Sequence, residues 1–367
     1  MAHTLLAAAF VVTTAVTGYA APTPAPTSPP GPVAVTTCGQ TVTSDAYLAR
    51  DLTCPTDTAV VLAGDGVDLD LRGHVLRGTR ESNGVVLPGW ENHTISNGTI
   101  RGFGAGVSTT EVDVTVTEPR VRLQDVVLRE NGFGLDASFT SRVVVTGGRV
   151  VDNDHGVSGG FRGYVEVTGG TLFRGNGLAI SQWVDVEGAT FTGNDLVGEC
   201  SDGYLRISGS RVTRNRQVFG STFACAPVLE SSYVAHNDLV LPVEHYPSGT
   251  ALLTDNEFVR NGVVIDAFGP VEAVGNTFVR NDVAVRSPEV GVPEENPDWV
   301  WAHVTLTDNV FLRNGDAIDV LSPGVLTGNR VERSTGWGIH APDVTDGGGN
   351  TASRNGREPQ CTGVVCG

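Results

Sequence analysis

The chain has 367 residues, with 41 acidic side chains against 24 basic ones, and its formal net charge is −17. This acidity argues against a nucleic-acid partner, because nucleic-acid binding requires a basic surface. It also disfavours binding of polyuronates, unless divalent cations bridge the two negative surfaces. Carboxylate oxygens are suitable ligands for Ca²⁺, which is therefore the candidate cation. Solubility of an exported protein is the simpler explanation of the negative charge.

The N-terminal residues have the pattern of an export signal. Residues 1–21 hold an apolar core of about 12 residues followed by small residues, which predicts a signal peptide and a secreted, extracellular protein. The apolar run is too short for a membrane span, and no second one follows it. Residues 22–37 begin with PTPAPTSPPGP and are predicted to form an extended Pro-rich linker.

Residues 38–367 form the predicted main domain, which repeats itself with a period in the low twenties. The clearest copies are LTDNEFVRNG, residues 253–262, and LTDNVFLRNG, residues 306–315. Twelve copies align on one apolar column: Leu76, Ile100, Leu128, Val150, Leu172, Phe191, Val212, Val234, Phe258, Phe278, Phe311 and Val331. This repetition predicts a solenoid of about 12 coils, each coil being one turn of the chain.

Two further columns predict the turns of each coil. Three residues before the apolar column every copy has Gly, Asp, Asn or Ser, which favour a sharp bend. Three residues after it, most copies have asparagine: Asn131, Asn153, Asn194, Asn215, Asn237, Asn261, Asn281 and Asn314. Stacked in register, these amides would hydrogen-bond from coil to coil.

Each copy is therefore predicted to contain three short strands. Runs rich in Val, Thr, Ile and Phe are typical of strands, and no stretch has sustained helical periodicity. Three strands in one repeat cannot lie flat, so the chain must coil, with successive coils about 4.8 Å apart. A leucine-rich repeat shares the period but needs a denser leucine pattern. The predicted fold class is all-β, a single-domain parallel β-helix.

The chain has six cysteines, and in a protein predicted to be exported this implies disulfides. Six cysteines allow fifteen connectivities. We favour the local one: Cys38 with Cys54, Cys200 with Cys225, and Cys361 with Cys366. A solenoid exposes its last apolar layer at each end, so the outer pairs are predicted to lie in short caps and the central pair to join neighbouring coils. A metal site is the alternative, but no C-x₂₋₄-C pair occurs.

The stretch LTDNVFLRNGDAIDV, residues 306–320, resembles the coil unit of right-handed parallel β-helix proteins of the pectin-lyase-like superfamily, which includes pectate lyases and polygalacturonases. The cysteine-bearing ends resemble those of secreted bacterial β-helix proteins of largely unassigned function. The resemblance covers residues 38–367 and implies a right-handed solenoid. It implies no single activity, because this fold carries lyases, hydrolases, epimerases and non-enzymatic adhesins. The chain has no lysine, so the family's Arg-x-Lys clamp is absent.

One surface column is the candidate catalytic or binding row. Alternation along the strand after the asparagine turn places Asp266, Arg286, Asp319 and His340 outward on neighbouring coils. Two carboxylates, an arginine and a histidine would hold a uronate, a metal ion and a proton-transfer group. Arg286 between carboxylates is expected to stay protonated and to act as a clamp. The alternative interpretation is a cross-strand ion-pair ladder without function.

An insertion after Arg286, SPEVGVPEENPDWVWAH, supplies candidate substrate-binding residues. These are Trp299, Trp301, Glu294, Glu295 and Asp298. Indoles stack on sugar faces and carboxylates bond hydroxyls, although the indoles would equally well pack the loop onto the solenoid. The sequence thus predicts binding of an extracellular or cell-surface polysaccharide without turnover. The alternative is a polysaccharide lyase or glycoside hydrolase acting on acidic polysaccharide, assisted by Ca²⁺.

A second polar patch, Asp152, Asp154 and His155, lies on the predicted asparagine turn. Short polar side chains at turns bond the nearby backbone, so we interpret this patch as turn chemistry.

Overall fold

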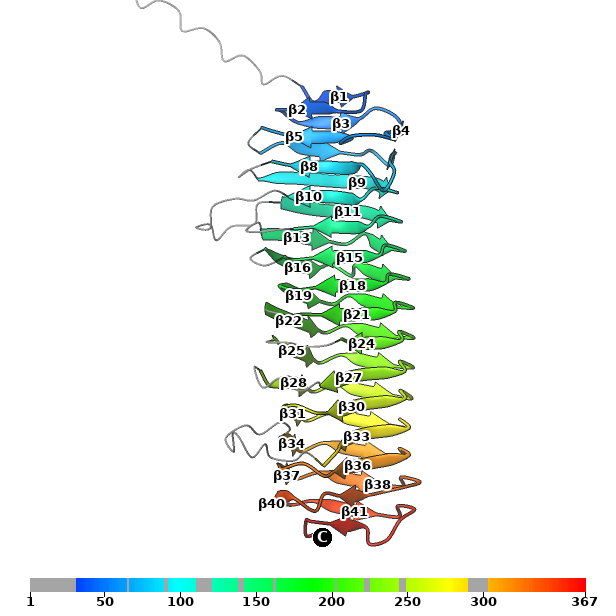
Figure 1. Ribbon diagram of the computed structural model, residues 1–367, viewed down its shortest axis with the longest axis vertical. Coiled ribbons are helices and arrows are strands. Elements are labelled where there is room, and N and C mark those ends of the chain that lie inside the picture. Colours follow the sequence, from blue (N-terminus) through cyan, green and yellow to red (C-terminus); the bar gives the residue numbers. More distant parts are fainter. Residues whose placement is uncertain are drawn as a thin grey trace, which may run out of the picture. The chain divides into compact units, whose positions relative to one another are not determined.

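The structure is a computed structural model that describes residues 31–64, 66–88, 92–109, 121–137, 142–160, 163–201, 203–220, 225–243, 249–289 and 303–367. Residues 32–367 form one compact unit in which short strands wind into a column of stacked coils (Figure 1). This column is a right-handed parallel β-solenoid of about 13 turns, which confirms the predicted fold class. No residue that the structure describes is helical.

The strands of successive coils pair in parallel and form three stacks, which we number in the order in which the chain visits them. Stack 1 consists of β1 (Val33–Val35), β3 (Ala46–Leu48), β6 (Asp68–Asp70), β9 (His93–Arg101), β11 (Val121–Arg129), β13 (Arg142–Thr146), β16 (Tyr164–Thr168), β19 (Val184–Glu187), β22 (Gly203–Ser208), β25 (Cys225–Glu230), β28 (Ala251–Thr254), β31 (Val271–Val274), β34 (Val304–Thr307), β37 (Gly324–Thr327) and β40 (Val344–Gly348).

Stack 2 follows the first bend of each coil. It consists of β4 (Leu52–Thr53), β7 (Val75–Arg77), the second halves of β9 and β11, β14 (Arg149–Val151), β17 (Leu172–Arg174), β20 (Thr190–Thr192), β23 (Arg211–Thr213), β26 (Tyr233–Ala235), β29 (Glu257–Val259), β32 (Thr277–Val279), β35 (Val310–Leu312), β38 (Arg330–Glu332) and β41 (Thr351–Ser353). Because β9 and β11 run through the bend, stacks 1 and 2 join into one sheet of 27 strands.

Stack 3 follows the asparagine turn and is a separate sheet of 15 strands. It consists of β2 (Gln40–Val42), β5 (Val60–Leu62), β8 (Asn83–Leu87), β10 (Ala105–Thr109), β12 (Phe133–Asp136), β15 (His155–Ser158), β18 (Leu178–Ser181), β21 (Leu196–Glu199), β24 (Gln217–Phe219), β27 (Leu239–Val243), β30 (Val263–Ala267), β33 (Val283–Ser287), β36 (Asp316–Val320), β39 (Ile339–His340) and β42 (Cys361–Thr362).

The first strand lies within residues 22–37, the stretch predicted as linker. Strand β1 pairs in parallel with β3, with Val33 opposite Ala46. The paired structure therefore begins at Val33 and not at Cys38. The predicted signal peptide, residues 1–21, lies outside the described residues.

The predicted apolar column lines the core, with one correction. Phe173, not Leu172, pairs with Val150 and Phe191, and it is fully buried. The turn after Thr168 is one residue longer than the turn after Thr146, which shifts the strand register by one and exchanges the inward side chain. Stacked rings such as Phe278 on Phe311, with centroids 4.6 Å apart, fill the core between coils.

The predicted sharp bend is confirmed in every copy. All twelve positions have a left-handed backbone, with φ between 46° at Ser231 and 80° at Gly73. Glycine meets no steric penalty there, and asparagine and aspartate tolerate the conformation better than other side chains. This local preference explains why the bend was visible in the sequence.

The predicted asparagine ladder is also confirmed, and Asn176 joins it. It runs without a break through Asn131, Asn153, Asn176, Asn194, Asn215, Asn237, Asn261, Asn281 and Asn314. From Asn153 onward, each Oδ1 accepts hydrogen bonds from the backbone N–H and the Nδ2 of the asparagine one coil earlier, whereas Asn131 Oδ1 accepts from the backbone N–H of Phe103. Asn176 follows Phe173 by three residues. It was not counted in the predicted ladder because the predicted apolar column contained Leu172 in place of Phe173.

A second ladder, which the sequence analysis missed, lies at the first bend. It passes through Asn256, Asn276, Asn309, Asn329 and Asn350, and Ser210 and Ser232 continue it toward the N-terminus. Its signal was the asparagine two residues before the apolar column in LTDNEF and LTDNVF. The two ladders satisfy the buried backbone groups of both short turns.

The three predicted disulfides are present: Cys38–Cys54, Cys200–Cys225 and Cys361–Cys366. The first and last pairs lie in the terminal coils, where they close the caps. Cys200 and Cys225 are buried and join the coil that contains β21 to the start of β25.

Candidate functional site

The predicted surface row is assembled on stack 3. Asp266 of β30 pairs with Arg286 of β33, which pairs with Asp319 of β36, which pairs with His340 of β39. The four side chains therefore follow one another on successive coils, as the alternation predicted. The register is set by the inward residues of the same strands, such as Ile265, Val285 and Ile318, which are fully buried.

Within this row the charges pair with one another. Arg286 donates from Nε to Asp266 Oδ1 at 2.9 Å and from Nη2 to Asp266 Oδ2 at 2.6 Å. This hydrogen-bonded contact raises the pKa of Arg286, and the charge of Asp319 raises it further. The guanidinium therefore stays protonated, as predicted for a clamp. Its Nε and Nη2 donors, however, already bind Asp266.

The other half of the row is a histidine–carboxylate contact. His340 Nδ1 lies 2.8 Å from Asp319 Oδ1, and the indole of Trp337 stacks on the imidazole with ring centroids 4.4 Å apart. The guanidinium of Arg357 lies over the Trp337 ring, with its central carbon 4.9 Å from the ring centre. Each member of the row thus has a partner inside it, which is the geometry of a cross-strand ion-pair ladder.

The loop residues predicted to bind sugar lie outside the described residues: Glu294, Glu295, Asp298, Trp299 and Trp301. The described ends of the insertion are Ser287–Glu289, next to Arg286, and His303. The interpretation that this loop overhangs the row therefore stays a prediction.

The patch on the asparagine turn makes contacts with other coils, and not the bonds to nearby backbone that were predicted for it. Asp152 has a left-handed backbone with φ of 55°. Asp154 accepts two hydrogen bonds from Arg80, at 2.7 and 3.1 Å. His155 stacks on Phe133 with ring centroids 4.6 Å apart. The Phe133–His155 stack joins two neighbouring coils, whereas the Arg80–Asp154 contact reaches from the turn before β8 to the turn before β15.

A surface with more features of a binding site lies on stack 1, and it was not predicted from the sequence. Tyr164 begins β16, Trp183 directly precedes β19, and Tyr204 lies in β22. Because Val165 pairs with Val184 and Val184 with Leu205, these three aromatic side chains follow one another on consecutive coils. We call them the aromatic row. The indole of Trp183 is 38% exposed and lies against Gly203, where a β-carbon would approach Nε1 to 3.1 Å.

A polar network borders the aromatic row. Arg206 donates from Nη1 to Asp185 at 3.0 Å and from Nη2 to Glu230 at 2.8 Å. The hydroxyl of Tyr164 donates to Asp185 Oδ2 at 3.2 Å. Asp185 and Arg206 stand beside each other in adjacent strands, so the row has a hydrogen-bonding border fixed by the sheet.

The titration of this network favours binding groups over a catalytic base. Burial raises the pKa of Tyr164 to about 12, and the neighbouring Asp185 adds to the shift. Burial likewise raises the pKa of Tyr204. Burial alone would lower the pKa of Arg206, but its hydrogen bonds to Glu230 and Asp185 outweigh that effect and raise it. Two neutral phenols and a permanently charged guanidinium donate hydrogen bonds and do not abstract protons.

The aromatic row had a signal in the sequence, since the three rings recur at the spacing of the repeat. Tyr164, Trp183 and Tyr204 each stand eight residues before a member of the predicted apolar column, Leu172, Phe191 and Val212, but this aromatic column was not recognised.

The described residues contain no group of three or more His, Cys, Asp or Glu side chains arranged to hold a metal ion. They also contain no helix long and apolar enough to cross a membrane.

Comparison with known proteins assigns no family to the chain. No protein-family model, no curated protein and no solved structure matches it. The resemblance to the pectin-lyase-like superfamily therefore stays a prediction, whereas the right-handed parallel β-solenoid is what the structure establishes.

Proposed function

We propose that this protein binds an extracellular polysaccharide along the outer face of stack 1, without chemical turnover. The observation that carries the proposal is the aromatic row: Tyr164, Trp183 and Tyr204 on three consecutive coils. Coils repeat every 4.8 Å or so, which is comparable with the rise of one sugar unit in an extended glycan. Each ring would therefore meet the apolar face of one sugar unit.

The bordering charges would supply orientation. Asp185, Glu230 and Arg206 are only partly exposed, with 24%, 37% and 30% of their side chains accessible. Their mutual hydrogen bonds hold the carboxylates in place, so little side-chain entropy remains to be lost when they bond sugar hydroxyls. The rigid solenoid thus supports a preorganised surface, and the disulfides suit an oxidising, extracellular environment.

The test is a glycan array with wild type and the Trp183→Ala, Tyr204→Ala double variant. We expect the double variant to lose on the order of tenfold in affinity, since each aromatic contact contributes about 0.5–1.5 kcal/mol beyond area burial. The matched control is Tyr47→Ala with Tyr233→Ala, which removes two rings elsewhere. If wild type binds a glycan and the aromatic-row variant binds it equally well, the proposal is wrong.

One observation favours a carbohydrate-active enzyme as the second candidate. The 2.8 Å contact between His340 and Asp319 is an arrangement that proton-transfer sites use. The assay is the ultraviolet absorbance of unsaturated products, or new reducing ends, from a panel of polyuronates with and without Ca²⁺. Product formed by wild type and abolished by His340→Gln would replace the binding proposal with catalysis.

A further inference from the structure

A row of arginines lies at the turn between stacks 2 and 3, directly before the asparagine ladder. It comprises Arg260, Arg280, Arg313, Arg333 and Arg354, one on each of five consecutive coils. The backbone N–H of each of the first four donates to the strand of the next coil, for example Arg280 to Leu312 at 3.0 Å and Arg313 to Glu332 at 2.9 Å. These bonds keep the arginines in register, about 4.8 Å apart. We call these five residues the arginine row.

The guanidiniums of the arginine row are exposed and unpaired. Among the described residues none of the five has a side-chain hydrogen bond or an ion pair. Many other arginines of this chain are neutralised, as Arg206 is by Asp185 and Glu230, and Arg286 by Asp266. Five positive charges at this spacing repel one another. They remain without acidic partners even though the chain has 41 acidic residues.

The backbone gives no reason for arginine at these positions. All five have a left-handed conformation, with φ between 53° at Arg260 and 60° at Arg354. Glycine takes this conformation without steric cost, and the same position in earlier coils is glycine twice and otherwise Glu130, Asp152, Arg214 and His236. Arginine is strained there, so its recurrence indicates a demand for the guanidinium itself.

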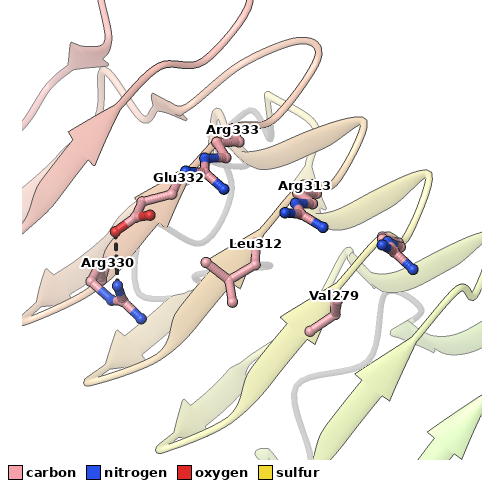
Figure 2. A pocket seen from close by; sticks show the side chains of 7 residues that line it. Val279, Leu312, Arg313, Arg330, Glu332 and Arg333 are labelled. Carbon is pink, nitrogen blue, oxygen red and sulfur yellow. Dashed lines mark hydrogen bonds and ion pairs between the residues drawn. The ribbon is translucent and has the colours of Figure 1, made fainter.

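The arginine row forms one edge of a pocket of about 530 Å³. The lining residues are Val279, Arg280, Leu312, Arg313, Arg330, Glu332 and Arg333. Figure 2 shows Arg313 and Arg333 side by side along the turn, with Leu312 and Val279 on the adjoining strands. Glu332 faces Arg330, which it binds at 2.8 Å. The pocket therefore combines a basic edge with an apolar floor.

We propose that the arginine row binds the acidic groups of an extended anionic polysaccharide that runs in the direction in which the coils stack. Guanidinium forks pair with carboxylates and sulfates through two parallel hydrogen bonds. A glycan with one acidic group per sugar unit repeats its charge at a spacing close to that of the coils. Its C–H faces would lie on Val279 and Leu312. This site is separate from the aromatic row and does not rest on it.

The lining favours a glycan over a nucleic acid. Proteins that bind single-stranded nucleic acid combine a basic groove with aromatic side chains on which the bases stack. None of the seven residues that line the pocket is aromatic.

The experiment measures binding of the full chain to a polyuronate, a sulfated polysaccharide, a neutral glucan and single-stranded DNA, at low and physiological salt. The test variant is Arg280→Gln, Arg313→Gln, Arg333→Gln. We expect wild type to bind at least one of the two acidic polysaccharides, with an affinity that falls as salt rises. The variant should lose on the order of tenfold in affinity for it.

The control variant is Arg50→Gln, Arg149→Gln, Arg174→Gln, which makes the same charge change at exposed sites elsewhere. An equal loss in the control, no loss in the test variant, no binding by wild type, or tighter binding of DNA would each overturn the proposal. If the glutamine variant fails to fold, the Asn substitutions at the same three positions replace it, because asparagine tolerates the left-handed backbone. Retained polyanion binding by the aromatic-row variant would separate this site from the proposed function.

Discussion

Replacing Asn281 with leucine tests the asparagine ladder at a position where every partner is known. Asn281 Oδ1 accepts from the backbone N–H of Asn261 at 2.9 Å and from its Nδ2 at 3.0 Å. Asn281 Nδ2 donates to Phe258 O and to Asn314 Oδ1, both at 3.1 Å. The side chain is 1% exposed, so water cannot replace these contacts.

Leucine has a similar volume but no polar atoms, so the substitution removes the hydrogen bonds without opening a large cavity. It leaves the buried N–H of Asn261 without an acceptor, which costs about 1–3 kcal/mol, and it removes further bonds worth about 1 kcal/mol net. We therefore expect the free energy of unfolding to fall by roughly 2–4 kcal/mol.

The assay is denaturant unfolding followed by circular dichroism, with the slope of the transition compared between variants. The control is Asp282→Leu at the next, exposed position, which should change stability by no more than about 0.5 kcal/mol. A midpoint for Asn281→Leu equal to that of wild type would refute the view that the stacked amides stabilise the turns.

Three further predictions concern the cysteines, the tyrosine network and the loop. Peptide mapping of the protein without reduction should join Cys38 to Cys54, Cys200 to Cys225 and Cys361 to Cys366, and free thiols would contradict this. The pKa of Tyr164 is raised to about 12 from 10.0, so its contribution to stability is complete below pH 10 and disappears as the pH rises toward 12; Tyr164→Phe should therefore flatten the alkaline loss measured by denaturant titration. The Trp299→Ala, Trp301→Ala variant should bind glycans more weakly than wild type on the array, and equal binding would make the loop structural.

The sequence by itself determined the repeat, the fold class and both kinds of turn. These features depend on the backbone and hydrogen-bonding preferences of individual residues. Gly73 or Asp255 is chosen because its own backbone is left-handed, and Asn281 because its amide matches a peptide group one coil away. The cysteine pairs followed equally directly, since each pair lies close in the chain as well as in space.

The tertiary structure alone decided which surface residues meet and which remain unpaired. The row from Asp266 to His340 was predicted as a column, but only the register and side-chain geometry show that its charges satisfy one another. The aromatic row has one spacing from the predicted apolar column, but its hydrogen-bonding border, in which Tyr164 and Arg206 donate to Asp185, appears only in the structure. A net charge of −17 is a sum over the whole chain, whereas pairing is decided contact by contact, so the five free guanidiniums of the arginine row are apparent only in the folded solenoid.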